Sequence, residues 1–163
     1  MNKEIEQAMI CACRFLTARR RSKKELEYHL KRKNYSEEAA GLVLERLEQY
    51  GYLDDYTFTR LWVEQRLPKR GLTGLKCELK AKGVEPGLIS EIIAELDPDA
   101  EYKAAMSLAL KKIKNSGGSC SFTKMARFLQ NKGFSFEVID GICRTLKENG
   151  VLLTPAGLRH MNG

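Results

Sequence analysis

The stretch LKRKNYSEEA, residues 30–39, decides the fold, because its pattern returns twice along the chain. It reads LKAKGVEPGL at 79–88 and LQNKGFSFEV at 129–138. Each copy ends a helix-like run at Asn34, Gly83 or Gly133, residue types that readily adopt the left-handed conformation closing a helix. These turns are 49 and then 50 residues apart, so the chain contains three copies of a unit of about fifty residues.

One helix is predicted after each turn. In the first copy Ser36 is a suitable N-cap, and Glu37 and Glu38 lie in the first turn, where the helix dipole favours acids. Apolar residues then recur at i, i+3, i+4 and i+7, the spacing of one helix face. They are Ala40, Val43, Leu44 and Leu47, then Ile89, Ile92, Ile93 and Leu96, and finally Ile139, Ile142, Cys143 and Leu146.

Two further helices are predicted before each turn. The nearer one carries an apolar pair four residues apart: Leu26 and Leu30, Leu75 and Leu79, Met125 and Leu129. The farther one is amphipathic through Ile5, Met9, Ala12 and Leu16, then Phe58, Leu61 and Trp62, then Tyr102, Ala105, Met106 and Ala109. The unit is therefore three helices.

The junctions between units set the expected boundaries. Gly51 ends a helix and Asp54 starts the next, while Asp97 caps a helix whose first position is Pro98. We predict three-helix repeats at 1–53, 54–97 and 98–163, the last with a short C-terminal tail in which Thr154 and Pro155 open a closing turn.

An all-α tandem array of three three-helix repeats, elongated and able to curve, is the predicted fold. Fifty residues bury too little surface to be stable alone, so neighbouring repeats should stack. Strand signals are nearly absent, because no sustained period-two alternation is bounded by hairpin turns. Repeats of 34 residues, or of two helices in 40 to 47 residues, do not fit the observed period.

Composition excludes several classes of protein. The chain has 163 residues, 43% of them hydrophobic and 30% charged, which is typical of a globular domain. AMICAC at 8–13 is too short to span a membrane, so we expect a cytoplasmic protein without membrane contact. The five cysteines form no Cys-x-x-Cys pair and the two histidines are far apart, so neither a metal nor another cofactor is expected.

Catalytic motifs are absent from the sequence. It contains no phosphate loop with the Walker spacing, no Gly-x-Ser-x-Gly, no His-Glu-x-x-His and no Rossmann fingerprint. Neither histidine lies beside a plausible nucleophile in sequence. We therefore predict that the chain is not an enzyme.

The positive charge is concentrated in three windows. Residues 19–33 contain eight basic and two acidic side chains, 66–82 six and one, and 111–132 six and none. By contrast, 84–99 contains five acidic side chains and no basic one. Repetition in space would make one side of the array positive, which suits a polyanion or an acidic protein groove.

Structural interpretations compete at each charged or aromatic position. Basic residues near a helix C-terminus complement its dipole, and Lys31, Arg32 and Lys33 precede Asn34 directly. Asp54 and Asp55 are more typical of an N-cap than of a metal pair. Trp62 and Tyr52 could stack on bases, but their helical spacing favours the core.

Three segments resemble the RecX family of regulators of the RecA recombinase. They are LTARRRSKKELEYHLKRKNYSEE, VLERLEQYGYLDDYTFTRLWVEQRL and RGLTGLKCELKAKGV. The resembling features are an arginine-rich end of the first helix, a Ser-x-x-Glu-Leu opening of the second, a Gly-Tyr-Leu-Asp-Asp junction, and Arg-Gly and Lys-Gly turns. The resemblance covers residues 12–97 well and 100–150 more loosely.

The resemblance implies a monomer that binds the RecA filament on single-stranded DNA and dampens its ATP hydrolysis, strand exchange and co-protease activity. This places the chain in homologous recombination, DNA repair and the SOS response. It also implies contact through basic residues at Arg19, Arg21, Lys31, Arg66 and Arg70. Arg20 and Lys69 neighbour them, and the charge pattern alone adds Lys76, Lys80, Lys82, Lys124, Arg127 and Lys132.

Two other functions are compatible with the same residues. One is a stand-alone DNA-binding protein that places a helix-turn-helix in the major groove, although the second helices carry mainly Lys and Glu rather than base-reading side chains. The other is a neutral scaffold whose charges only confer solubility. The sequence also leaves open whether DNA is contacted directly or through the filament.

Overall fold

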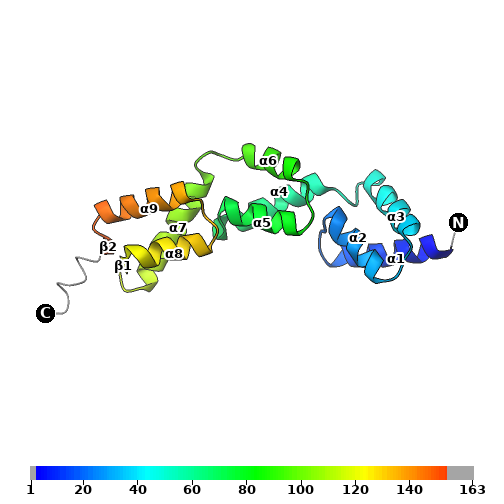
Figure 1. Ribbon diagram of the computed structural model, residues 1–163, viewed down its shortest axis with the longest axis horizontal. Coiled ribbons are helices and arrows are strands. Elements are labelled where there is room, and N and C mark those ends of the chain that lie inside the picture. Colours follow the sequence, from blue (N-terminus) through cyan, green and yellow to red (C-terminus); the bar gives the residue numbers. More distant parts are fainter. Residues whose placement is uncertain (1–2, 154–163) are drawn as a thin grey trace. The chain divides into compact units, whose positions relative to one another are not determined.

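The computed structural model of the protein describes residues 3–153 (Figure 1). The predicted closing turn at Thr154 and Pro155 lies outside the described residues. In chain order the elements are α1 (Lys3–Ala18), α2 (Lys23–Arg32), α3 (Glu37–Gln49), α4 (Asp55–Arg66), the 3-10 helix η1 (Leu67–Lys69), α5 (Leu72–Ala81), α6 (Pro86–Ala94), α7 (Ala100–Asn115), β1 (Cys120–Ser121), α8 (Phe122–Asn131), α9 (Phe136–Glu148) and β2 (Leu152–Leu153). The predicted all-α class, with helices in successive triplets, is confirmed.

The turns that end the second helices have the predicted backbone conformation. The φ angles of Asn34, Gly83 and Gly133 are 64°, 74° and 80°. Ser36 then caps α3, because its hydroxyl oxygen accepts the Ala39 backbone N–H at 3.2 Å. The local pattern of residues therefore fixes where one helix ends and the next begins.

The predicted apolar faces form the cores. In the first triplet the buried cluster includes Leu26, Leu30, Val43, Leu44 and Leu47. In the third triplet a second cluster includes Met125, Leu129, Ile139, Ile142, Cys143 and Leu146. In the middle triplet the side chains of Phe58, Leu75, Leu79, Ile89 and Ile92 are buried.

The chain divides into two compact units whose boundary runs through α4 and α5. One unit is Met1–Trp62 with Glu78–Ala94, and the other is Val63–Cys77 with Glu95–Gly163. The repeat boundaries at 1–53, 54–97 and 98–163 remain a prediction.

In the first unit, the start of α2 is joined to residues of the second triplet. The Ser22 hydroxyl donates to the Lys82 carbonyl at 2.6 Å, and the Lys23 backbone N–H donates to Asp55 Oδ1 at 2.8 Å. An ideal Cβ added to Gly83 would lie 2.4 Å from Cβ of Lys24, so the turn approaches the helix closely. The Lys23 N–H lies in the first turn of α2, where backbone N–H groups lack intrahelical partners, and the Ser22 hydroxyl belongs to the N-cap residue of the same helix.

The second unit contains an equivalent joint, between 46 and 50 residues further along the chain. The Gly71 backbone N–H donates to the Lys132 carbonyl at 2.9 Å, and the Leu72 N–H donates to Glu101 Oε1 at 3.0 Å. Glu101 is buried, and its Oε1 also accepts the Ser135 N–H at 3.3 Å. In both joints, therefore, a helix start meets a carboxylate and a turn carbonyl of the following triplet. We call these two sets of contacts the helix-start joints.

Of the two predicted starts at Asp54 and Asp97, one agrees with the structure and one does not. Asp54 caps α4 as predicted, because its Oδ1 accepts the Tyr56 N–H at 3.0 Å. The prediction for Asp97 and Pro98 is wrong, since α7 begins at Ala100. Asp97 Oδ1 accepts the Asp99 N–H at 3.0 Å and thereby forms a turn that delays the helix.

The strand pair is the feature of the third triplet that the sequence did not indicate. Cys120 is paired in parallel with Leu152, and Ser121 with Leu153. Figure 1 shows β1 and β2 side by side next to α8. Two residues are too few to produce a period-two pattern, which explains why no strand was predicted.

Candidate functional site

Three arginines follow α1, and their surroundings differ. Arg19 Nη2 donates to Glu25 Oε1 at 2.9 Å. The Arg21 guanidinium carbon lies 4.2 Å from the centre of the Phe15 ring, and burial, followed by the charge of Arg19, lowers the Arg21 pKa. Arg20 is exposed. Arg20 is thus presented to solvent, whereas Arg19 and Arg21 make contacts within the protein.

Lys82 takes part in a cluster centred on Glu25. Lys82 Nζ lies 3.1 Å from Glu25 Oε1 and 4.4 Å from the centre of the Trp62 ring. Glu25 Oε2 accepts the Ser22 backbone N–H at 3.0 Å, which completes a capping box at the start of α2. Burial alone would raise the Glu25 pKa, but Ser22, Arg19 and Lys82 together hold it below its usual value. The Lys82 ammonium therefore contributes to the first joint.

Lys31 is exposed and makes two ion pairs. Its Nζ lies 3.1 Å from Glu27 and 3.2 Å from Glu37, and hydrogen bonds to these carboxylates raise the Lys31 pKa. Pairs of this kind on a surface contribute little stability, so Lys31 can exchange its partners for another anion at little cost.

Five predicted residues lie on or near α5. Arg66 and Arg70 are half-buried, and Arg70 Nη1 donates to the Asn131 carbonyl at 3.3 Å. The other three are exposed: Lys69 in η1, and Lys76 and Lys80 on α5.

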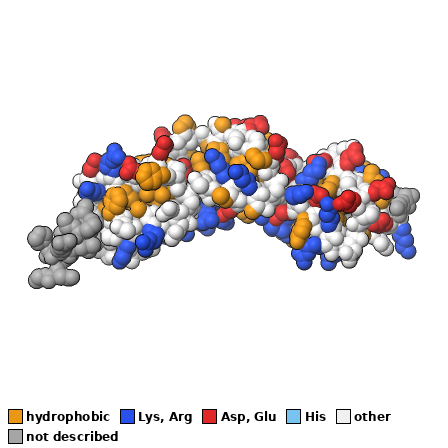
Figure 2. Space-filling view, in the orientation of Figure 1, with side chains coloured by type: hydrophobic (Ala, Val, Ile, Leu, Met, Phe, Trp, Pro, Cys, Tyr) orange, Lys and Arg blue, Asp and Glu red, His pale blue; other side chains and the backbone are white. Residues whose placement is uncertain are grey.

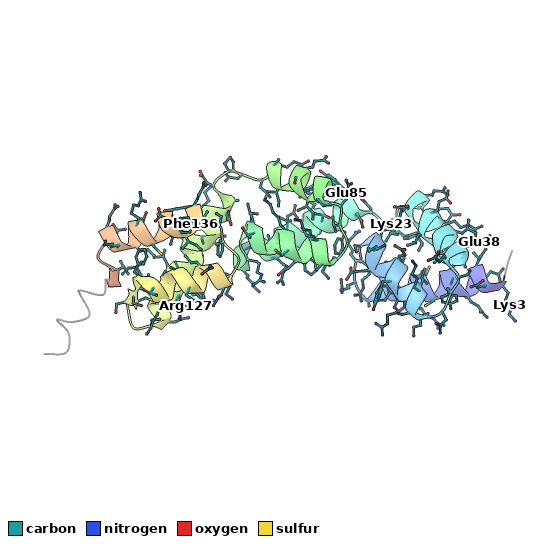
Figure 3. All side chains as sticks on the ribbon, viewed as in Figure 1. Lys3, Lys23, Glu38, Glu85, Arg127 and Phe136 are labelled. Carbon is teal, nitrogen blue, oxygen red and sulfur yellow. The ribbon has the colours of Figure 1, made fainter. Side chains whose placement is uncertain are left out.

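Three predicted residues lie on α8 or directly after it, and two of them are exposed. Lys124 and Arg127 are exposed, and Figure 3 shows Arg127 on α8. Lys132 is half-buried, and its Nζ lies 5.9 Å from the Phe128 ring centre, which also has the Lys112 ammonium at 4.7 Å. Phe128 is therefore covered by two cations, an arrangement that attracts each to the ring face.

The predicted basic residues fall into two groups. Those exposed are Arg19, Arg20, Lys31, Lys69, Lys76, Lys80, Lys124 and Arg127, and those half-buried are Arg21, Arg66, Arg70, Lys82 and Lys132. On the face shown in Figure 2, Lys and Arg side chains are interspersed with Asp and Glu. A binding role for these residues remains a prediction, and the exposed group is the better placed for it.

A groove in the first unit contains residues that the charge pattern did not indicate. It has a volume of about 700 Å³, and Met9, Leu16, Leu47 and Phe58 are among its apolar lining residues. Arg20, Arg21, Tyr50 and Tyr52 also line it. The expectation that Tyr52 belongs to the core is wrong, because 72% of its surface is exposed. Two tyrosines flanking Gly51, at the end of a helix, were the available sequence signal.

A second cavity, of about 590 Å³, is lined by residues of α1, α2 and the turn after α2. Within it the His29 ring stacks on Phe15 with centroids 3.9 Å apart, and His29 Nε2 lies 3.6 Å from Cys11 Sγ. Burial, followed by the charges of Lys33, Arg32 and Arg21, lowers the His29 pKa. The neutral imidazole is thereby favoured, which suits stacking and a contact with a thiol.

Over residues 3–153 no three His, Cys, Asp or Glu side chains are grouped so that they could hold a metal ion. No helix in that range is both long and apolar enough to cross a membrane.

Known proteins resemble this chain over most of its length. A family model described as RecX, first three-helix domain, matches residues 8–47. The regulatory protein RecX of Streptomyces coelicolor is 35% identical over 136 residues, which cover 80% of this chain and 72% of that protein. That of Mycobacterium sp. (strain JLS) is 36% identical over 143 residues, covering 82% and 78%.

Solved structures agree in fold. The crystal structure of RecX from Lactobacillus salivarius has a TM-score of 0.79 and 20% sequence identity, over 90% of this chain and 99% of that one. A second RecX crystal structure has a TM-score of 0.72 at 22% identity. At these identities the likeness concerns the fold alone.

Proposed function

Because the chain belongs to the RecX family of regulatory proteins, we propose that it binds the RecA filament on single-stranded DNA and lowers its ATPase, recombinase and co-protease activities. The observation that carries the proposal is the recurrence of exposed cations on or beside the second helix of each triplet: Arg20 and Lys31, then Lys69, Lys76 and Lys80, then Lys124 and Arg127. Cations spaced in this way suit a long polyanion.

The proposed role requires binding and no bond-making chemistry. RecX relatives carry the name of regulatory proteins rather than of enzymes. Binding alone can inhibit RecA. A protein that binds one conformational state of the filament more tightly than another shifts the equilibrium between the two states by the difference in its binding free energies. Whether the chain occupies a filament end or its groove determines how much protein is needed for inhibition.

The first test adds the protein to RecA that is hydrolysing ATP on single-stranded DNA. We expect the rate to fall as protein is added, with a substantial effect by one protein per RecA protomer. An unchanged rate at that ratio contradicts the proposal. Tight binding to duplex DNA in the absence of RecA would instead favour the helix-turn-helix alternative.

A matched pair of variants tests the role of charge. Lys124→Glu with Arg127→Glu reverses two exposed charges on α8, while Lys147→Glu reverses an exposed charge on α9 outside the predicted set. We expect the double variant to weaken filament binding and its salt dependence, and Lys147→Glu to change both much less. If both cations contact phosphates of single-stranded DNA, the slope of log K for binding against log salt concentration should become less steep by about 0.7 for each cation reversed. Equal behaviour of the two variants would indicate that the charges on α8 serve solubility only.

A further inference from the structure

We propose that the groove between α1 and the α3–α4 junction binds an unstacked base of single-stranded nucleic acid. Tyr50 and Tyr52 contact the base, and Arg20 and Arg21 face the adjacent backbone phosphates. The inference rests on the proposed function in that single-stranded DNA is the ligand. It goes further by assigning direct base contact to one groove, and by predicting DNA binding that does not require RecA.

The two tyrosine rings are exposed far more than a core role would allow. The exposed fractions of Tyr50 and Tyr52 are 70% and 72%. Both residues line the groove, and they flank Gly51 in the turn after α3. Aromatic rings presented to solvent are the groups on which nucleic-acid-binding proteins stack bases, and each such contact contributes about 1–3 kcal/mol.

The turn that presents the rings is fixed by the backbone. Gly51 has a φ of 74°, a value that favours glycine, and its N–H donates to the Glu48 carbonyl at 3.0 Å. The N–H groups of Tyr52 and Leu53 both donate to the Leu47 carbonyl, at 2.9 and 3.2 Å. Because the turn is already ordered, binding a base here costs little additional backbone entropy.

The remaining lining matches the other parts of a nucleotide. Met9 and Leu16, both half-buried, provide an apolar surface for the flat face of a base, and the buried side chains of Leu47 and Phe58 lie beneath it. A volume of about 700 Å³ is within the range of ligand sites and leaves room for a nucleotide.

The charge at the groove favours an anion. Arg20 and Arg21 both line it, and Asp54 is the acidic residue among its described lining. The Asp54 carboxylate is occupied in capping α4, since it accepts the Thr57 hydroxyl and the Tyr56 N–H. The nearby cations Arg19, Lys23 and Lys24 are each paired with a carboxylate, so Arg20 and Arg21 carry the positive charge of the groove itself.

The experiment measures the affinity of the full chain for a fluorescent oligothymidylate of about twenty nucleotides in low salt. The test variant is Tyr50→Ala with Tyr52→Ala. The matched control is Tyr28→Ala, which removes another exposed tyrosine of the same unit, 64% exposed on α2 and 5.8 Å from the Arg32 guanidinium. Circular dichroism and the melting temperature verify the fold of each variant.

We expect the double variant to lose at least about tenfold in affinity, and Tyr28→Ala to stay within about twofold of the wild type. An abasic oligomer of the same length retains the phosphates and loses the bases. The wild type should bind it more weakly than oligothymidylate, and the double variant should bind both oligomers equally.

Several outcomes overturn the inference. The first is an unchanged affinity of the double variant for oligothymidylate. The second is a loss of affinity by the double variant that is equally large on the abasic oligomer. The third is that the wild type does not bind bare single-stranded DNA. The double variant could also bind oligothymidylate normally but no longer bind the RecA filament. That result would indicate that the groove binds a protein side chain and not a base. If the wild-type protein binds bases as expected but does not change the ATPase rate of RecA, the proposed function is contradicted and the assignment of the groove is not.

Discussion

Gly71→Ala should destabilise the protein, because the helix-start joint of the second unit has no room for a side chain at this position. An ideal Cβ on Gly71 would lie 2.3 Å from both Cα and N of Phe134 and 2.4 Å from the Gly133 carbonyl oxygen. These neighbours are backbone atoms, so relief requires the two segments to separate by about 1 Å, since ordinary contacts begin near 3.5 Å.

Separation on that scale breaks the hydrogen bonds of the joint. The Gly71 N–H bonds to the Lys132 carbonyl at 2.9 Å, and the Gly74 N–H to the Gly133 carbonyl at 3.0 Å. Each bond contributes about 1 kcal/mol net, and a buried group left without a partner costs about 1–3 kcal/mol. We therefore expect Gly71→Ala to lower the free energy of unfolding by about 2–4 kcal/mol.

Urea denaturation followed by circular dichroism measures this change, and Gly41→Ala is the matched control. An ideal Cβ on Gly41 meets nothing within 4 Å, and Gly41 lies within α3, so the same substitution should stabilise the protein by about 0.5–1 kcal/mol. Equal unfolding free energies for Gly71→Ala and the wild type would refute the steric reasoning. Destabilisation by both variants would show that loss of glycine, rather than the close approach, is responsible.

Two carboxylates give further predictions. Glu25→Gln should destabilise the protein at neutral pH, because burial opposes ionisation but hydrogen bonds, including that from Lys82, hold the Glu25 pKa below its unfolded value. This stabilisation is fully present above the pKa of Glu25 in the unfolded chain and is lost as the pH falls through its pKa in the folded protein. The melting temperatures of the wild type and the variant should therefore converge in acid. A difference that stays constant with pH contradicts the reasoning. Glu101→Gln should cost about 1–3 kcal/mol, measured by urea denaturation, because two backbone donors, Leu72 and Ser135, lose a charged acceptor. An unchanged stability would indicate that the amide oxygen serves equally well.

Local features of the fold were predictable because the sequence contains their cause. The positions of Leu26, Leu30, Val43 and Leu47 follow from helical periodicity, and each is buried. Asn34 takes the left-handed conformation for the reason that favours Asn and Gly at helix ends. These inferences needed no partner from elsewhere in the chain.

Features that depend on distant partners were not predictable. Charge alone places Lys82 in the predicted binding set, and nothing near it in the sequence indicates that its ammonium contacts Glu25, which lies 57 residues earlier. The role of Glu101 depends on α5 and α9 meeting around one carboxylate. Helical spacing predicts Tyr52 in the core, but the residue lies beyond the end of α3, where helical periodicity no longer applies, and it is exposed.

The helix-start joints also have a direction, with consequences for protein design. Each earlier triplet supplies backbone or hydroxyl donors, and each later one supplies a carboxylate and a carbonyl, so Asp55 and Glu101 serve the same purpose in the two joints. A fourth triplet grafted after residue 153 would need an acid and a tight turn facing the start of α8. The pairing of Ser121 with Leu153 lies immediately before that helix start, so the graft would have to replace it. Extension of this chain is therefore a problem of supplying acceptors for the first turn of α8.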